Sequence, residues 1–227
     1  MKFRKNTVLI FGLLLLFFSS FQLGCFQENE LHEGLINSGE ILEDEINTIP
    51  SVDRVKLEQK AKEAKKFCKE KNYNQDFCIL IDMSLHSGVN RFFVWDFEKN
   101  KVIQENLVSH GCCLGNPSMG DASKEQPEFS NTPDSHCSSL GKYLIGERGY
   151  SQFGVNIKYL LHGLESTNNN ALKRVVVFHS WGIIPNEPLY PKGTPESWGC
   201  PAISDAAFLK LDKKLKESEK VLMWIFV

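Results

Sequence analysis

The chain has 227 residues, of which 42% are hydrophobic and 24% are charged, and its formal net charge is −2. This length and composition are typical of one sizeable globular domain with short flanking segments. No basic cluster interleaves with aromatic residues, which excludes a nucleic-acid partner. No Gly-rich loop joins a strand pattern to a helix, which excludes a P-loop or dinucleotide site.

The first 24 residues have the pattern of an export signal. A basic start (MKFRKN) precedes an apolar run (TVLIFGLLLLFF) of about a dozen residues, which is too short to span a bilayer. The run leads to Gly24-Cys25, which resembles a bacterial lipobox, although Gln22 stands where an aliphatic residue is usual. We therefore predict a lipoprotein signal over residues 1–24 and an acylated Cys25 as membrane anchor. The protein would then face the periplasm or the cell surface in a bacterial envelope. An uncleaved anchor or an unlipidated leader is the alternative.

Residues 25–50 are acidic, dotted with Asn and Ser, and weakly periodic, which is typical of a flexible tether. From residue 51 the chain is expected to form one folded domain that continues to residue 227. Its first element, residues 51–71, repeats apolar residues at helical spacing and is charged elsewhere, which predicts an amphipathic helix. The repeating residues are Leu57, Ala61, Ala64 and Cys68.

Beyond the first helix the pattern changes to short β-branched and aromatic segments separated by turn residues, which predicts strands. The predicted strands are residues 77–83, 91–97, 101–110, 141–149, 155–164, 174–180 and 221–227. Residues 204–218 predict a second helix, with Ser204 as its N-cap and with Phe208, Leu211 and Leu215 on one face. Strands with few helices between them predict a mainly β fold, an antiparallel β-sandwich with helices at its edges.

The polar segment from Cys112 to Ser139 is too long for an ordinary connection, and loops of this kind are usually functional or disordered. The seven cysteines of the chain suggest an oxidising compartment. Cys68 could pair with Cys78, and Cys137 could pair with Cys112 or Cys113. Connectivity cannot be read from sequence. Five cysteines remain when Cys25 and Cys200 are set aside, and because five is odd, at least one thiol is unpaired or paired between molecules.

Cys200 and His179 are a candidate nucleophile and base. His179 ends an apolar strand pattern, and Cys200 lies between Gly199 and Pro201. Glycine lets backbone amides approach a reacting carbonyl, and proline fixes the departing chain. A thiol needs a nearby cation or helix dipole to become a thiolate. The alternative interpretation is a buried structural thiol and a core imidazole.

The segments FHS and PESWGCPAIS resemble the signature of the murein L,D-transpeptidase catalytic domain, in the branch with a Ser-Trp-Gly-Cys-Pro-Ala motif. The upstream segments FSNTPDSHCSSLGKYLIGE and YLLHGLESTNNNALKRVVVFHSW agree, so the resemblance covers residues 51–227. It implies an L,D-transpeptidase-like β-sandwich with peripheral helices. It also implies an enzyme without a cofactor that acts on peptidoglycan stem peptides through a cysteine acyl-enzyme, as an L,D-transpeptidase or an L,D-carboxypeptidase.

The resemblance also implies a role for each motif residue. Cys200 matches the nucleophile that attacks the carbonyl of a meso-diaminopimelate-type residue, and His179 matches the general base that later protonates the leaving amine. The Ser180 carbonyl matches the group that orients the imidazole. The amides of Gly199 and Cys200 match the oxyanion hole, and the Ser197 hydroxyl matches the support of this loop.

Two residues depart from the family pattern. Trp198 stands where a second histidine is common, and we expect it to wall the pocket. Glu196 stands where a basic or small residue is expected, and an acid beside the thiolate would oppose its ionisation. Upstream, Asn131, His136 and Ser139 match a family segment near the cleft, where substrate contact and loop architecture are the two interpretations.

A thiolate–imidazole metal site is the other chemistry that the residue types allow, but the spacings match no zinc template, so we predict no metal. The residues concerned are His110, Cys112, Cys113, His136, Cys137 and His162. The alternative function is a catalytically inactive wall- or partner-binding lipoprotein on the same fold, with Cys200 oxidised or inert. No feature of the sequence indicates an oligomeric state.

Overall fold

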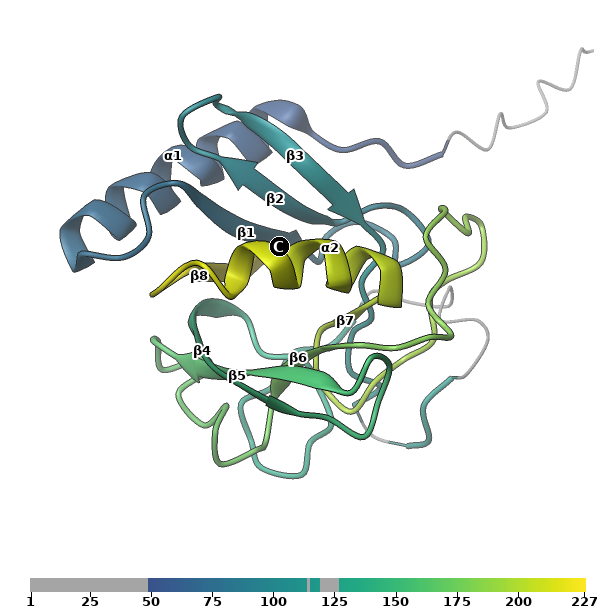
Figure 1. Ribbon diagram of the computed structural model, residues 1–227. Coiled ribbons are helices and arrows are strands. Elements are labelled where there is room, and N and C mark those ends of the chain that lie inside the picture. The colour runs from purple at the N-terminus through teal and green to yellow at the C-terminus, as the bar shows by residue number, and fades with distance from the viewer. Residues whose placement is uncertain (1–48, 114, 119–126) are drawn as a thin grey trace, which may run out of the picture. The chain divides into compact units, whose positions relative to one another are not determined.

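The computed structural model describes residues 49–113, 115–118 and 127–227. The predicted signal, the anchor at Cys25 and nearly all of the predicted tether lie outside these residues. The elements in chain order are α1 (Arg54–Lys71), β1 (Phe77–Asp82), β2 (Phe92–Asp96), β3 (Lys101–Asn106), β4 (Gly141–Tyr150), β5 (Ile157–Gly163), β6 (Val177–Ser180), β7 (Ala202–Ile203), α2 (Asp205–Leu215) and β8 (Leu222–Phe226) (Figure 1). Within the described part of the chain, no helix is both long and apolar enough to cross a membrane.

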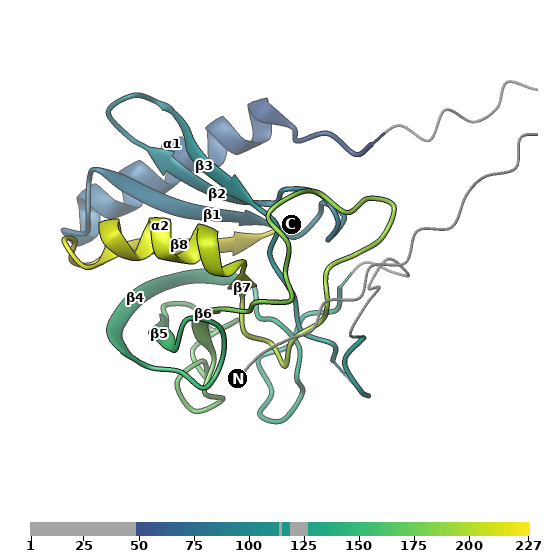
Figure 2. The same cartoon turned by 45° about the vertical axis from the view of Figure 1, so that its right-hand side comes forward.

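The eight strands form one mixed sheet in the order β3-β2-β1-β8-β4-β5-β6-β7. The pairs β1–β8 and β6–β7 are parallel, and the other neighbours are antiparallel. The first and last strands are therefore neighbours, with Ile79 opposite Met223 and Ile81 opposite Ile225. The predicted mainly β class with helices beside the strands is confirmed, and two halves of one sheet supply its two layers (Figures 1 and 2).

Helix α2 lies between the half formed by β1–β3 and β8 and the half formed by β4–β6, as both views show (Figures 1 and 2). Ser204 caps it as predicted, because its side chain accepts a hydrogen bond from the N–H of Ala207. Phe208 is fully buried, and its ring lies 5.0 Å from that of Phe178 in β6. Burying one such ring stabilises the fold by about 2–3 kcal/mol, and this contact fixes β6 against the core.

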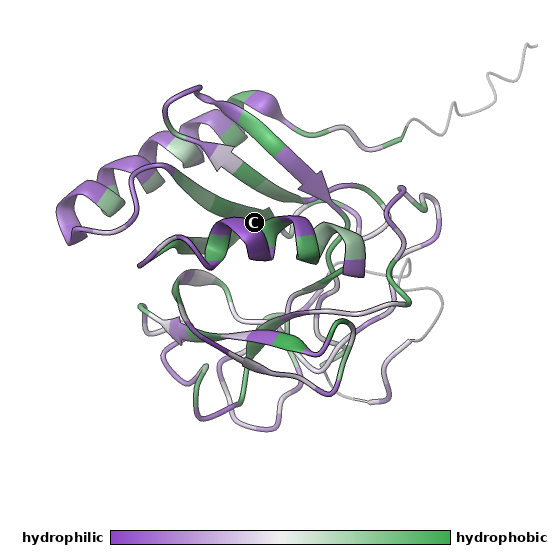
Figure 3. Ribbon diagram, in the orientation of Figure 1, coloured by the Kyte–Doolittle hydropathy of each residue, from purple (hydrophilic) through white to green (hydrophobic). Residues whose placement is uncertain are grey.

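Helix α1 covers the opposite face of the sheet, over β1, β2 and β8. Its four predicted apolar positions are all buried, and elsewhere the helix is mostly hydrophilic (Figure 3). Cys68 in α1 and Cys78 in β1 belong to this second core cluster and are not bridged. Burial raises the pKa of Cys68 to about 12 and that of Cys78 well above its ordinary value, so both thiols stay protonated at neutral pH.

Candidate active site

The parallel pairing of β6 and β7 brings the two chain segments that carry the predicted base and nucleophile to the same edge of the sheet. His179 pairs with Ala202, and the His179 N–H donates to the Pro201 carbonyl at 3.4 Å. Cys200 lies two residues before β7. His179 and Cys200 line one pocket of about 510 Å³. The two-residue strand β7 was not predicted, because so short a segment has no periodicity to recognise.

A second segment, residues 107–112, holds the nucleophile loop from its other side. The Ser109 N–H donates to the Ala202 carbonyl at 2.9 Å, and the Ser197 N–H donates to the His110 carbonyl at 2.8 Å. The Cys112 N–H donates in turn to the Ser197 carbonyl at 2.9 Å. The loop that carries Cys200 is therefore fixed by backbone hydrogen bonds on both flanks.

Within this loop, Ser197 and Gly199 set the position of the thiol. Ser197 Oγ donates to the Cys200 carbonyl at 2.7 Å and accepts from the Gly199 N–H at 3.2 Å. Gly199 has a φ of 99°, and a Cβ there would lie 2.6 Å from the Cys137 carbonyl oxygen, so only glycine fits. Because the Gly199 amide is engaged by Ser197, it does not face the pocket in this state. The Cys200 N–H finds no acceptor among the residues that the structure describes.

The Cys200 thiol is held as a neutral group. Burial raises its pKa above the ordinary cysteine value, and the Val177 N–H, the Arg174 guanidinium and the Lys158 ammonium partly oppose this effect. The Val177 N–H lies 3.4 Å from Sγ. A thiol of raised pKa is a poor nucleophile by itself, so this site needs a base that removes the proton during attack.

His179 has the tautomer that such a base requires. Its Nδ1 lies 2.8 Å from the Ser180 carbonyl oxygen, which can only accept, so Nδ1 carries the hydrogen and Nε2 keeps its lone pair. Burial lowers the pKa of His179 below its ordinary value, with the Ser180 carbonyl acting in the opposite direction and Lys158 in the same direction. The imidazole is therefore neutral at neutral pH and ready to accept a proton.

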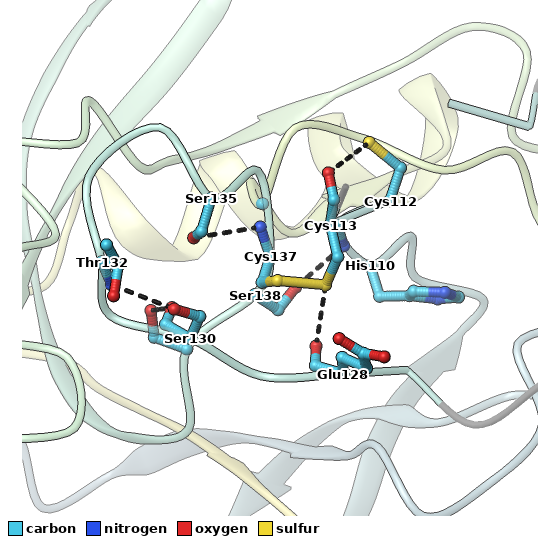
Figure 4. The surroundings of a disulfide bond; sticks show 12 residues. His110, Cys112, Cys113, Glu128, Ser130, Thr132, Ser135, Cys137 and Ser138 are labelled. Atoms are coloured by element: carbon cyan, nitrogen blue, oxygen red, sulfur yellow. Dashed lines mark hydrogen bonds between the residues drawn. A yellow bond between two sulfur atoms is a disulfide. The ribbon is translucent and has the colours of Figure 1, made fainter. Parts of the chain in front are cut away.

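The pocket has a second wall, built by residues 130–139. A disulfide joins Cys113 to Cys137 and ties this segment to the chain that follows residue 107 (Figure 4), while Cys112 keeps a free thiol. This bridge is one of the pairings that the sequence left open. The His136 ring stacks on the Trp198 indole, with centroids 4.9 Å apart and planes 12° apart, and both line the pocket. Trp198 thus stands at the pocket wall.

Arg174 is a pocket residue that the sequence analysis did not identify. Its guanidinium donates to the carbonyls of Ser130 and Cys137 and to the hydroxyls of Ser135 and Ser139. It precedes β6, which begins at Val177 rather than at residue 174 because Val175 has a φ of 55° and interrupts the extended chain. The pair Lys173-Arg174 before a strand pattern looks like an ordinary solvated flank, so the sequence carried no signal for this role.

Asn131 and Ser139 are not among the residues that line the pocket. The Asn131 side-chain amide donates to the Ser166 carbonyl at 2.9 Å and to Asn169 Oδ1 at 2.8 Å. Ser139 is buried, and its hydroxyl donates to the Ser130 carbonyl at 2.8 Å. Their polar groups are used within the protein, so the structure places these two residues in the architecture of the loop. Among the three candidates of this segment, His136 lies at the pocket.

In the described residues, no group of three or more His, Cys, Asp or Glu side chains is arranged to hold a metal ion. Cys113 and Cys137 are bonded to each other, and His162 Nε2 lies 3.3 Å from Glu147 Oε2. His110 lies against Arg91, with Nη2 2.8 Å from Nδ1.

Comparison with solved structures finds chains at 13% identity. An L,D-transpeptidase from Xylanimonas cellulosilytica has a TM-score of 0.36, with 71% of this chain and 68% of that chain covered. The Ldtfm–avibactam carbamoyl enzyme has a TM-score of 0.39, with 68% of this chain and 50% of that chain covered. The helical cell shape determining protein Pgp2 from Campylobacter jejuni has a TM-score of 0.41, with 77% of this chain and 56% of that chain covered. This chain thus spans between half and about two thirds of the length of these proteins.

No curated protein sequence matches the chain. Residues 49–224, by contrast, match the family described as the L,D-transpeptidase catalytic domain. The match includes both walls of the pocket and the whole sheet apart from the last two residues of β8. The chain belongs to the L,D-transpeptidase catalytic domain family, whose members modify peptidoglycan in the cell wall.

Proposed function

We propose that this protein is an L,D-transpeptidase of the bacterial envelope that acts on peptidoglycan stem peptides through an acyl-enzyme on Cys200. The observation that carries the proposal is the pairing of β6 with β7, which brings a neutral thiol and a neutral imidazole whose Nε2 keeps its lone pair into one pocket. Family membership supplies the substrate class.

In this proposal His179 Nε2 takes the thiol proton while Sγ attacks the stem-peptide carbonyl. The negative charge that develops on the carbonyl oxygen is stabilised by the Cys200 N–H, which has no competing acceptor in the described part of the chain. The tetrahedral intermediate expels the amine of the leaving residue, which receives its proton from the His179 imidazolium. The product of this half-reaction is a thioester on Cys200.

The second half-reaction decides between two outcomes. An amine from another stem attacks the thioester, with His179 as base, and gives a cross-link and a free thiol. Water attacking in the same way gives a trimmed stem, which is the L,D-carboxypeptidase reaction. The same residues serve both outcomes, so the balance depends on how the pocket admits the acceptor.

The envelope location belongs to the same proposal. A family of cell-wall enzymes works outside the cytoplasm, and the predicted signal over residues 1–24 would export the chain. Acylation of Cys25 would tether the catalytic domain to a membrane through residues 25–50.

The test is incubation of the purified protein with muropeptides, with masses recorded for both peptides and protein. We expect an acyl adduct on wild type, and cross-linked or trimmed products. Cys200→Ala should lose both and keep its fold, because truncating one small side chain costs only about 1 kcal/mol. The matched control is Cys112→Ala, which removes the other half-exposed thiol and should leave activity unchanged. Turnover by Cys200→Ala would refute the assignment.

A further inference from the structure

Glu196 lies at the pocket wall, four residues before Cys200. Its Oε2 accepts from the Ser118 N–H at 2.7 Å, and its own N–H donates to the Ser118 carbonyl at 2.8 Å. Only 20% of the side chain is exposed. The carboxylate is therefore fixed from both its side chain and its backbone rather than free in solvent.

A buried histidine lies behind this carboxylate. His110 Nε2 is 3.6 Å from Glu196 Oε1, and His110 Nδ1 is 2.8 Å from Arg91 Nη2. Because a guanidinium only donates, Nδ1 must accept, and the imidazole hydrogen sits on Nε2 and faces Glu196. Burial, with Arg91 and His86 adding to it, lowers the pKa of His110 to about 3, so the ring is neutral.

Among the described residues, the groups that contact the Glu196 carboxylate carry no positive charge. Its two neighbours, the Ser118 amide and the His110 imidazole, are neutral donors. In the part of the chain that the structure describes, no Lys or Arg nitrogen lies within 4.0 Å of this carboxylate. A carboxylate that is four-fifths buried and has no cationic partner among the described residues can accept one from a ligand.

The sequence led us to expect that Glu196 would oppose ionisation of the thiol. The structure gives a different picture, because burial, the Val177 N–H, Arg174 and Lys158 account for the pKa shift of Cys200. Glu196 instead adds to burial in raising the pKa of Cys112. Glu196 is therefore not among the groups that shift the pKa of Cys200.

The other pocket groups agree with a cationic ligand at this wall. Asp134 is a second acid in the lining, and Trp198, Phe153 and Trp181 supply aromatic faces. The cation in the lining, Arg174, is already engaged by four acceptors in residues 130–139. The pocket thus holds two carboxyl groups in the same lining as the reacting thiol.

We propose that Glu196 is a specificity-determining residue that binds a primary ammonium group of the stem peptide. This inference rests on the proposed function and names the substrate group that the site selects. Two sources share this chemistry: the side-chain ammonium of the diamino acid in the peptide that acylates Cys200, and the amine of the accepting stem. The acetylation of either amine removes the charge that Glu196 recognises.

The test uses Glu196→Gln, which keeps an oxygen for the Ser118 N–H and removes the charge. Acylation of Cys200 is measured by mass with two acylating stem peptides, one with a free side-chain ammonium and one acetylated there. Resolution is measured separately, as the ratio of cross-linked to hydrolysed product at fixed acceptor concentration. We expect wild type to favour the charged group by about ten- to hundredfold, and the variant to lose that preference.

The outcomes separate the two sources and the two hypotheses. Loss of preference in acylation assigns the ammonium to the acylating peptide, and loss only in the product ratio assigns it to the acceptor. Equal preferences in wild type and Glu196→Gln overturn the inference while leaving the proposed function intact. If wild type forms no acyl-enzyme at all, the proposed function itself is refuted. Glu219→Gln, which changes an exposed acid outside the pocket, is the matched control and should keep the wild-type preference, and unchanged alkylation of Cys200 by iodoacetamide verifies that the variant loop is intact.

Discussion

The two walls of the pocket are built by different means. The catalytic wall, His179 and Cys200, is held by backbone hydrogen bonds between β6, β7 and residues 107–112. The loop wall, residues 130–139, has no strand of its own and is held mainly by side chains: the Cys113–Cys137 disulfide, Arg174 and Asn131. A wall made of backbone pairing tolerates side-chain changes, whereas a wall held mainly by side-chain contacts depends on them.

The backbone of the loop wall shows the same dependence. Asp134 has a φ of 60° and His136 a φ of 55°, and Cys113 at the other end of the disulfide has a φ of 58°. Non-glycine residues in this region cost about 1–3 kcal/mol each unless their surroundings hold them there. The bridge and the arginine supply that restraint, and so they place the His136 ring against Trp198.

The largest effect is expected on the catalytic wall. His179→Ala should lower kcat/KM by about 10²- to 10⁴-fold, because the neutral thiol loses its base. The wild-type rate should stay high below pH 6.5 and fall only as the pH drops through the lowered pKa of His179, where the imidazole protonates. In the variant this acid limb disappears, and residual alkylation of Cys200 keeps rising at alkaline pH because burial raises the thiol pKa. An unchanged pH profile would refute the role of His179.

A smaller effect is expected when the bridge of the loop wall is removed. Cys113→Ser with Cys137→Ser frees a segment with a sequence separation of 24 residues, which should lower the free energy of unfolding by about 3 kcal/mol. Because the catalytic wall does not use this bridge, alkylation of Cys200 should keep its wild-type rate while KM for the peptide rises. Denaturant unfolding and steady-state kinetics measure the two quantities. Cys112→Ser is the control, and an equal loss there would show that the bridge is not the cause.

The difference between the walls also decides what the sequence could predict. The catalytic wall follows only in part from strand patterns: the seven predicted strands, including β6, and both helices are present, but the two-residue β7 was not predicted. Four apolar positions in α1 and the Ser204 cap were identified because periodicity and capping are local properties. The L,D-transpeptidase family was recognised from the motif around Cys200, and the match over residues 49–224 confirms it.

The loop wall could not be predicted in the same way, because its contacts join residues far apart in the chain. Along the chain, Arg174 lies 35 residues from Ser139 and 44 from Ser130, and no local sequence pattern predicts such pairs. The choice between Cys112 and Cys113 as the partner of Cys137 depends on backbone geometry and not on composition. Asn131 and Ser139 match a motif, but only their hydrogen bonds show that they hold the loop.

The smallest effect should come from Arg174, which acts on both walls but only weakly on the thiol. Its charge lowers the pKa of Cys200, although burial and the Val177 N–H act more strongly on that thiol, and its guanidinium holds four groups of the loop wall. Arg174→Gln removes both contributions. Alkylation of Cys200 at pH 7.5 should then slow by about three- to tenfold, because the thiol pKa rises without the nearby cation.

Arg174→Lys separates the two contributions. Lysine keeps the positive charge near Sγ but cannot reach four acceptors with one ammonium group, because it lacks the planar fork of the guanidinium. Alkylation should therefore stay close to the wild-type rate in the lysine variant, while both variants should lose about 1–3 kcal/mol of unfolding free energy with the loop contacts. If lysine slows alkylation as much as glutamine does, the effect on the thiol comes from a displaced loop wall and not from charge, and the two walls are mechanically coupled through Gly199, whose Cα lies against the Cys137 carbonyl.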